Sequence, residues 1–119
     1  MGSPQRQPRG PQPHTPEQKI QALLPALNLS LRLLKEGYNA QDPTKEQVAI
    51  TELNTLIQQI KSFAQQIHGE PAKKYHNRLQ ALTADLNQLA IDLRKHHIQD
   101  INRGFSHLTQ DVDALRQLA

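Results

Sequence analysis

The stretch "LRKHHIQDINRG" (residues 93–104) decides how many helices this chain of 119 residues forms. Before it, apolar residues recur every three or four positions, as they do along one face of a helix. The next apolar residue, Ile98, follows Leu93 by five positions, and at about 100° per residue this step turns the stripe off its face. A break near His96 to Asp100 restores one core-facing stripe. We therefore predict that a helix ends here and another begins, with Asp100 as its candidate N-cap.

The same periodicity extends over the rest of the chain in four seams of apolar residues. The seams are Ile20, Leu24, Leu27, Leu31 and Leu34; Ala49, Leu53, Leu56, Ile60, Phe63 and Ile67; Ala72, Tyr75, Leu79, Leu82, Leu86, Leu89 and Leu93; and Ile98, Ile101, Phe105, Leu108, Val112, Leu115 and Ala119. Four segments of similar length with short connections predict an all-α fold, an antiparallel up-down four-helix bundle with a disordered N-terminal tail. The alternative is three helices, with a long bent third helix from about Pro71 to Leu118.

Capping residues and glycines mark the expected helix boundaries. Thr15 and Gln18 form a capping box around Pro16, which suits the first helical position. Either Asp42 followed by Pro43, or Thr44 with Gln47, caps the second helix. We expect Gly37 to end the first helix as a C-terminal cap and Gly69 to end the second. Pro25, inside the first helix, is expected to kink it.

Residues 1–15 are rich in proline and glycine and hold no aliphatic residue beyond Met1, which predicts a disordered tail before a helical bundle domain at residues 16–119. A linker role is favoured over a PxxP ligand for an SH3-type domain. The net charge is +3, but residues 17–119 hold twelve Lys and Arg against eleven Asp and Glu. This balance argues against a nucleic-acid partner. No run of apolar residues is long enough to be a transmembrane segment.

The adjacent histidines have two interpretations. His96 and His97 can form the polar end of a helix, or they can supply imidazole ligands to Zn or Cu. Neighbouring helical positions point about 100° apart, so two adjacent histidines rarely chelate one ion, and no metal site is predicted. The acidic residues off the seams are interpreted as solvated, and paired buried carboxylates are not expected; these residues are Asp85, Asp92, Asp111 and Asp113. Without cysteine or a catalytic motif, we expect neither an enzyme nor a cofactor.

The first helix carries a second apolar stripe on roughly the opposite face from its seam. It consists of Ala22, Ala26, Leu29 and Leu33. A helix that is apolar on both faces is covered on both faces. The stripe can therefore be a docking surface for a protein partner or for self-association. A phase shift at Pro25, or cover by the tail, would explain it equally well.

The segment "HHIQDINRGFSHLTQDVDALRQLA" (residues 96–119) carries Phe105, Leu108 and Thr109 in sequence. It resembles the closing helix of a bacterial periplasmic four-helix domain of unknown function, often attached to or encoded beside heavy-metal efflux adaptors. In that family an Arg precedes the Phe, and here Arg103 is displaced by one residue. The family continues into a Cys-Pro-Met segment that could bind copper. This chain has no cysteine, so metal binding is not carried over.

These observations favour a non-catalytic interaction module that docks a protein partner through the outer face of the first helix. The alternatives are a periplasmic metal-binding accessory protein that uses His96 and His97, and a structural protein that self-associates. The resemblance favours an extracytoplasmic, periplasmic location.

Overall fold

The computed structural model describes residues 15–118, and within them it contains four α-helices and no β-strand. The helices are α1 (Pro16–Asn39), α2 (Pro43–Ala64), α3 (Glu70–Lys95) and α4 (Ile98–Arg116). The all-α four-helix prediction is confirmed, and the alternative with one long third helix is wrong. The predicted tail lies outside the described residues, except for Thr15, which is the N-cap of α1.

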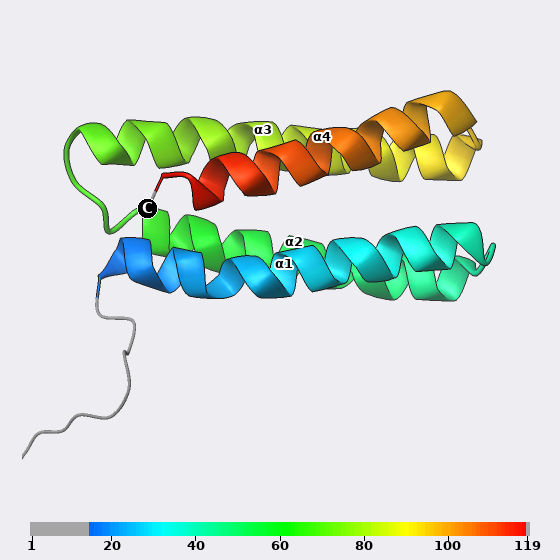
Figure 1. The fold of residues 1–119 in the computed structure, drawn as a ribbon, viewed down its shortest axis with the longest axis horizontal. Helices are drawn as coiled ribbons and strands as arrows, with labels where there is room; N and C mark the ends of the chain where they lie inside the picture. The colour runs from blue at the N-terminus through cyan, green and yellow to red at the C-terminus, as the bar shows by residue number, and fades with distance from the viewer. Residues whose placement is uncertain (1–14, 119) are drawn as a thin grey trace, which may run out of the picture.

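The four helices run in alternating directions along a common axis (Figure 1). The α1–α2 and α3–α4 turns lie at one end of the bundle, and the α2–α3 connection lies at the other. Each helix packs closely against its neighbours in sequence and α1 packs against α4, while across the diagonal the Gln21 side chain of α1 donates to the Tyr75 hydroxyl of α3 at 3.5 Å. Contacts are most extensive within α1–α2 and within α3–α4, so the bundle consists of two tight hairpins packed against each other.

The quoted stretch forms the turn between α3 and α4. His96 has a left-handed backbone with φ of 59°, and its N–H donates back to carbonyls of the last turn of α3. A residue in this conformation reverses the chain at a helix C-terminus. His97 then takes the N-cap position of α4, so the prediction that Asp100 is the N-cap is wrong. Asp100 lies in the first turn instead, where its negative charge is stabilised by the positive end of the helix dipole.

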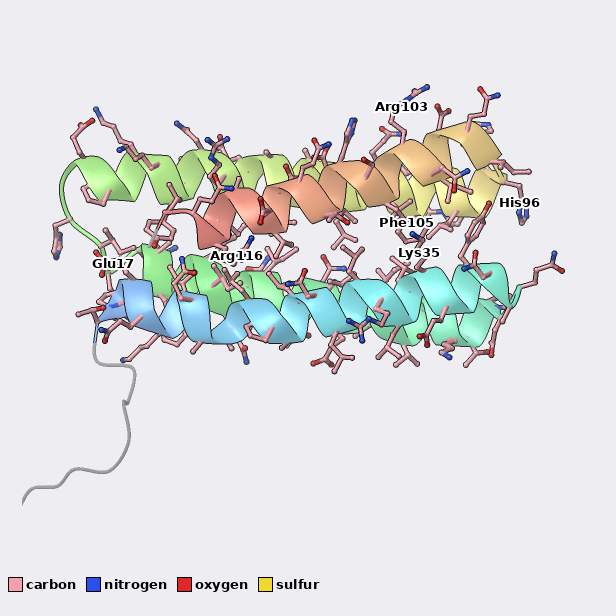
Figure 2. All side chains as sticks on the ribbon, viewed as in Figure 1. Glu17, Lys35, His96, Arg103, Phe105 and Arg116 are labelled. Carbon is pink, nitrogen blue, oxygen red and sulfur yellow. The ribbon has the colours of Figure 1, made fainter. Side chains whose placement is uncertain are left out.

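The predicted seams form the core except near their ends. Ile98 is 63% exposed, because α4 begins there and turns its buried face to Ile101. Phe63 and Ala72 are only partly buried, and Ile57 is buried although no seam includes it. Figure 2 shows the inward direction of the seam at Phe105, whose side chain points from α4 toward the α1–α2 hairpin. The last predicted seam residue, Ala119, lies outside the described residues.

The connection between α2 and α3 differs from the prediction. The helix ends at Ala64, not at Gly69, and Ile67 is buried in the connection. Gly69 occupies the N-cap position of α3 with φ of +83°, a conformation that glycine adopts without steric cost. Packing of Ile67 into the core therefore fixes the connection, and Gly69 redirects the chain into α3.

Capping at the start of the first two helices is confirmed. The Thr15 hydroxyl accepts from the Gln18 N–H at 3.1 Å, and the Gln18 side chain accepts from the Thr15 N–H at 3.3 Å. The Asp42 carboxylate accepts from the Lys45 N–H at 3.1 Å, so Asp42, and not Thr44, caps α2. Pro25 lies inside α1, which continues as one helix on both sides of it.

Gly37 does not end α1, contrary to the prediction. It is buried inside the helix, which extends to Asn39, and the positive φ of this turn belongs to Gln41. A Cβ atom at Gly37 would lie 3.0 Å from the backbone nitrogen of Glu46. Gly37 is therefore required for the close approach of α1 to the start of α2.

We expect Gly37→Ala to lower the free energy of unfolding by about 1–2 kcal/mol, because overpacking against backbone outweighs the gain in helix propensity. Gly104→Ala is the comparison variant, since its Cβ would meet the end of the buried Leu89 side chain at 3.0 Å and not a backbone atom. Its loss should be smaller than that of Gly37→Ala, because a side chain can shift more easily than backbone and the gain in helix propensity offsets part of the overpacking. Urea unfolding followed by circular dichroism measures both, and a Gly37→Ala protein as stable as the wild type would contradict the close approach.

Candidate functional sites

The predicted partner-binding stripe lies on α1 and faces solvent along most of its length. Ala22 is exposed, Ala26 is partly buried, and Leu29 and Leu33 are 52% and 37% exposed. The opposite face of α1 supplies the core with its five seam residues. Neither a phase shift at Pro25 nor another described segment covers these leucines, so the stripe is an apolar surface in addition to the core face.

A third exposed apolar side chain lies on α2, near the same end of the α1–α2 hairpin as Leu33. Val48 is 64% exposed and was not predicted as part of any site. Gly37 packs against Lys45 and Glu46, and α1 and α2 are antiparallel. One helical turn away from this contact, Leu33 on α1 and Val48 on α2 therefore lie at the same level of the hairpin. The position of Val48 relative to Leu33 could not be predicted from the spacing of the α2 seam, because it depends on how the two helices pair.

The histidines do not gather in one place within residues 15–118. His68 lies in the α2–α3 connection and His76 near the start of α3, both far from the α3–α4 turn, while His107 is exposed in the middle of α4. The predicted candidates His96 and His97 separate as well. His96 lies at the end of the bundle (Figure 2), where it borders a cavity of about 910 Å³ between the two turns.

That cavity lies where the two hairpins diverge. Its lining includes Tyr38, Ile50 and Leu93, together with the exposed Ile98. Burial raises the pKa of Glu46, another lining residue, above its ordinary value, and the His96 imidazole opposes the rise. The cavity is half open and is lined by both apolar and charged residues, and none of the predicted partner-binding residues lines it.

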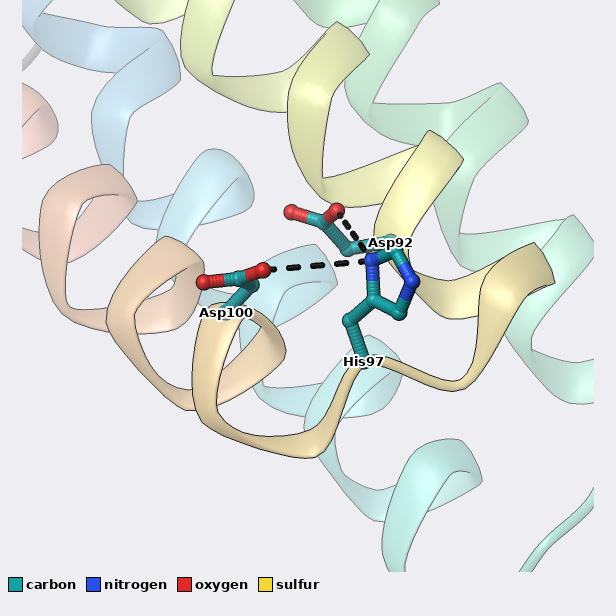
Figure 3. Close-up of side chains that lie close together, drawn as sticks. All are labelled: Asp92, His97 and Asp100. Carbon is teal, nitrogen blue, oxygen red and sulfur yellow. Dashed lines mark ion pairs between the residues drawn. The ribbon is translucent and has the colours of Figure 1, made fainter.

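His97 lies beside two carboxylates from different helices (Figure 3). Its Nδ1 atom is 3.4 Å from Asp92 Oδ1 on α3 and 3.8 Å from Asp100 Oδ2 on α4. One ligand atom from each of the three residues lies within 4.8 Å of the others. Asp92 is only 4% exposed, so its interpretation as part of a solvated face is wrong. It is buried because it follows the seam residue Leu89 by three positions and therefore faces α4.

A second pair of carboxyl groups lies farther along the same interface, and its burial also departs from the prediction. Asp111 Oδ2 on α4 is buried, and among the described residues it gains a hydrogen-bond partner only if it shares a proton with the neighbouring Asp85 carboxyl. Two carboxyl groups can hydrogen bond only when one of them is protonated. Burial, together with the hydrogen bond and negative charge of Asp85, raises the pKa of Asp111 to about 7, although Arg78 opposes the rise. Paired, partly buried carboxyl groups were not expected from the sequence.

Asp113 is the acidic residue for which the surface interpretation holds best. It forms an ion pair with Arg116, and its second carboxylate oxygen accepts from the Gln117 side chain. Both of these contacts are made within the last turns of α4 and are exposed.

No described helix is both long enough and apolar enough to cross a membrane. Neither a protein-family model, nor a curated protein, nor a solved structure matches this chain. The resemblance to the periplasmic four-helix domain and the periplasmic location therefore stay predictions.

Proposed function

We propose that this protein is a non-catalytic interaction module that docks an amphipathic helix of a protein partner along the outer face of α1. The docking residues are Ala22, Ala26, Leu29 and Leu33. The observation that carries the proposal is the exposure of Leu29 and Leu33 on a helix whose opposite face already completes the core. The exposed parts of these leucines add nothing to the stability of the free bundle, and neighbouring apolar side chains on a surface are typical of a binding site.

The spacing of the stripe favours a helix as the docking element. Its residues follow one another by four, three and four positions, which is the spacing of a seam between two packed helices. From Ala22 to Leu33 the stripe is about 16 Å long, or three helical turns. The two alanines leave room for large side chains of the partner, and the two leucines can insert between side chains on the partner helix.

Self-association is the second candidate function, because two copies of the stripe are complementary when they pair in antiparallel directions. Its alanines lie at one end and its leucines at the other, so two antiparallel copies would place leucines on alanines. However, each copy offers only two leucines and two alanines, whereas a stable interface buries about 1,200 Å² or more in total. A partner that also reaches Val48 on α2 can bury a larger area, so a separate protein is favoured over a second copy.

Site-specific photocrosslinking in the cells that make the protein tests this proposal. A photoreactive residue at Leu29 should crosslink one protein through an amphipathic helix, whereas the same residue at Gln58, exposed on the outer face of α2, should not. Sedimentation equilibrium at several concentrations separates the second candidate, since a crosslink between two copies requires a dimer. Equal crosslinking from both positions, or none from Leu29, would contradict the docking surface.

A further inference from the structure

The α3–α4 turn brings together side chains that suit a metal ion, at a place separate from the α1 stripe. We propose that Asp92, His97 and Asp100 bind one divalent transition-metal ion, for which Zn²⁺ is the best match. The three residues come from the last turn of α3, the turn itself and the first turn of α4 (Figure 3). The predicted candidate His96 takes no part, and the two aspartates take its place.

The separations between the three groups match ligands around a metal better than direct hydrogen bonds. Charge-assisted N–H···O bonds measure about 2.7–2.9 Å, whereas the His97 Nδ1 atom is 3.4 Å and 3.8 Å from its two carboxylate neighbours. Ligand atoms about 2.0–2.1 Å from a tetrahedral Zn²⁺ are about 3.3 Å apart. The partly exposed Asp100 side chain, whose Oδ2 is 3.8 Å from His97 Nδ1, would have to move closer to the other two groups to complete this arrangement.

The burial of Asp92 supplies the second argument. A buried carboxylate is normally paired with a cation or bound to a metal. Asp92 has no Lys or Arg partner within residues 15–118, and its contacts are the Gln88 side-chain amide at 3.2 Å and the His97 imidazole. Arg103 pairs with the Asp100 carboxylate, so the charge left without a fixed cation is that of the buried Asp92, whose charged neighbour among the described residues is the His97 imidazole when it carries a proton. A divalent cation between the three groups would balance this charge.

The surroundings hold the carboxylates in place as outer-shell partners do in metal sites. The Gln88 amide donates to Asp92 Oδ1, and Arg103 donates to Asp100 Oδ1 at 3.1 Å, leaving Asp100 Oδ2 directed at His97. The backbone N–H of His97 donates to the Asp92 carbonyl at 3.1 Å, which fixes the turn. Contacts that do not depend on an ion thus orient the two carboxylates and fix the turn that carries His97.

The type of ligand selects the class of metal. One imidazole nitrogen with two carboxylate oxygens suits Zn²⁺ and its neighbours in the transition series. Ca²⁺ takes six to eight oxygen ligands, which three residues at a helix junction do not supply. With three protein ligands, the fourth position of a tetrahedral ion would be left to water.

Calorimetric titration of the full chain with Zn²⁺ at neutral pH tests the site. We expect one ion per chain, with affinity reduced at least about 50-fold in His97→Ala and at least about 10-fold in Asp100→Asn, because each loses one of three ligands. The matched controls are His96→Ala, which removes the adjacent histidine, and Asp113→Asn, which removes an exposed aspartate of the same helix. Both controls should bind within about twofold of the wild type.

Nitrogen-15 NMR of the imidazole provides a readout that a merely structural turn would not change. Zn²⁺ should shift the Nδ1 resonance of His97, since that atom faces both carboxylates, and should leave the His96 ring unchanged. Co²⁺ should give the visible absorption of a tetrahedral site. Loss of affinity in His96→Ala equal to that in His97→Ala, coordination through Nε2, or no binding above that of the other exposed histidines would overturn the proposal.

Discussion

Leu27→Ala is expected to lower the free energy of unfolding by about 2–5 kcal/mol, whereas Leu29→Ala should change it by less than about 0.5 kcal/mol. Leu27 is completely buried in the seam of α1, while Leu29, two positions further along, is 52% exposed. The first substitution leaves a cavity in the core, and the second removes a side chain that contacts mainly water. Urea unfolding of both variants, followed by circular dichroism, measures the difference.

Because both substitutions replace leucine with alanine in the same helix, their effects on helix propensity are equal. The difference between them therefore reports burial alone. Equal losses of stability in the two variants would mean that Leu29 belongs to a core and is not available for docking. Leu33→Ala should behave like Leu29→Ala, with a slightly larger loss because it is less exposed.

The second large effect is a dependence of stability on pH that originates at Asp111. Burial and the Asp85 carboxyl raise the pKa of Asp111 to about 7 in the folded protein. An unfolded aspartate has a pKa near 3.9, so between about pH 4 and pH 7 the folded state binds the proton more tightly. Stability from this group is thus greatest at low pH and is lost as the pH rises to about 7.

We expect Asp111→Asn to remove this loss and to make the protein more stable than the wild type at pH 8, by about 1 kcal/mol. The change in the free energy of unfolding that corresponds to the whole pKa shift is larger. The Asp111 carboxyl group is partly exposed, however, and solvent screens its interaction with Asp85, so we expect a smaller effect. The control is Asp113→Asn, which removes a carboxylate already paired with Arg116 and should leave the pH dependence unchanged. Parallel pH profiles for the wild type and Asp111→Asn would show that Asp111 titrates normally.

The number of helices could be predicted because the information was local. The five-residue step from Leu93 to Ile98 breaks the seam, and the structure places the turn there. The starts of α1 at Thr15 and of α2 at Asp42 could also be predicted from the sequence, since each cap depends only on the next three residues. The sequence is sufficient to predict the conformation of a position when that conformation is determined by residues next to it in the chain.

Gly37 shows where this reasoning fails. A glycine at the end of an apolar seam is typical of a C-terminal cap, but here it lies inside the helix and contacts the start of α2. The close approach of two helices is a tertiary property that no local pattern contains. The same applies to Ile98, whose exposure follows from the new direction of α4 and not from its place in the apolar repeat.

The carboxyl groups between α3 and α4 did have a signal in the sequence. Three segments place an aspartate three positions after a seam leucine and directly before the next seam residue: "LTADL" (residues 82–86), "LAIDL" (residues 89–93) and "LTQDV" (residues 108–112). On a helix, positions three and four after a buried residue both lie near its face. The repeat predicts three aspartates at the edge of the core. Which of them meet could come only from the pairing of the two helices.

The exposed apolar stripe on α1 was predicted residue by residue, and the structure adds the exposed Val48 on α2 at the level of Leu33. The three proposed metal ligands were not predicted as a set, since Asp92, His97 and Asp100 converge only because the turn folds α4 back onto α3. In both cases the apolar periodicity was enough to predict the individual helices. Which residues of other helices lie beside each site depends on how the helices pair, and the sequence pattern does not contain this.

The affinity of the purified protein for the partner identified by crosslinking tests the central claim most directly. Leu29→Asp with Leu33→Asp should weaken binding at least about 100-fold, because charge replaces the apolar centre of the interface. Asn54→Asp with Gln58→Asp adds the same charge at the same four-residue spacing on the exposed face of α2 and should leave the affinity unchanged. Both variants should keep the helical circular dichroism of the wild type, and Leu29→Gln with Leu33→Gln provides a milder second test. Full binding by the folded Leu29→Asp, Leu33→Asp protein would contradict the account.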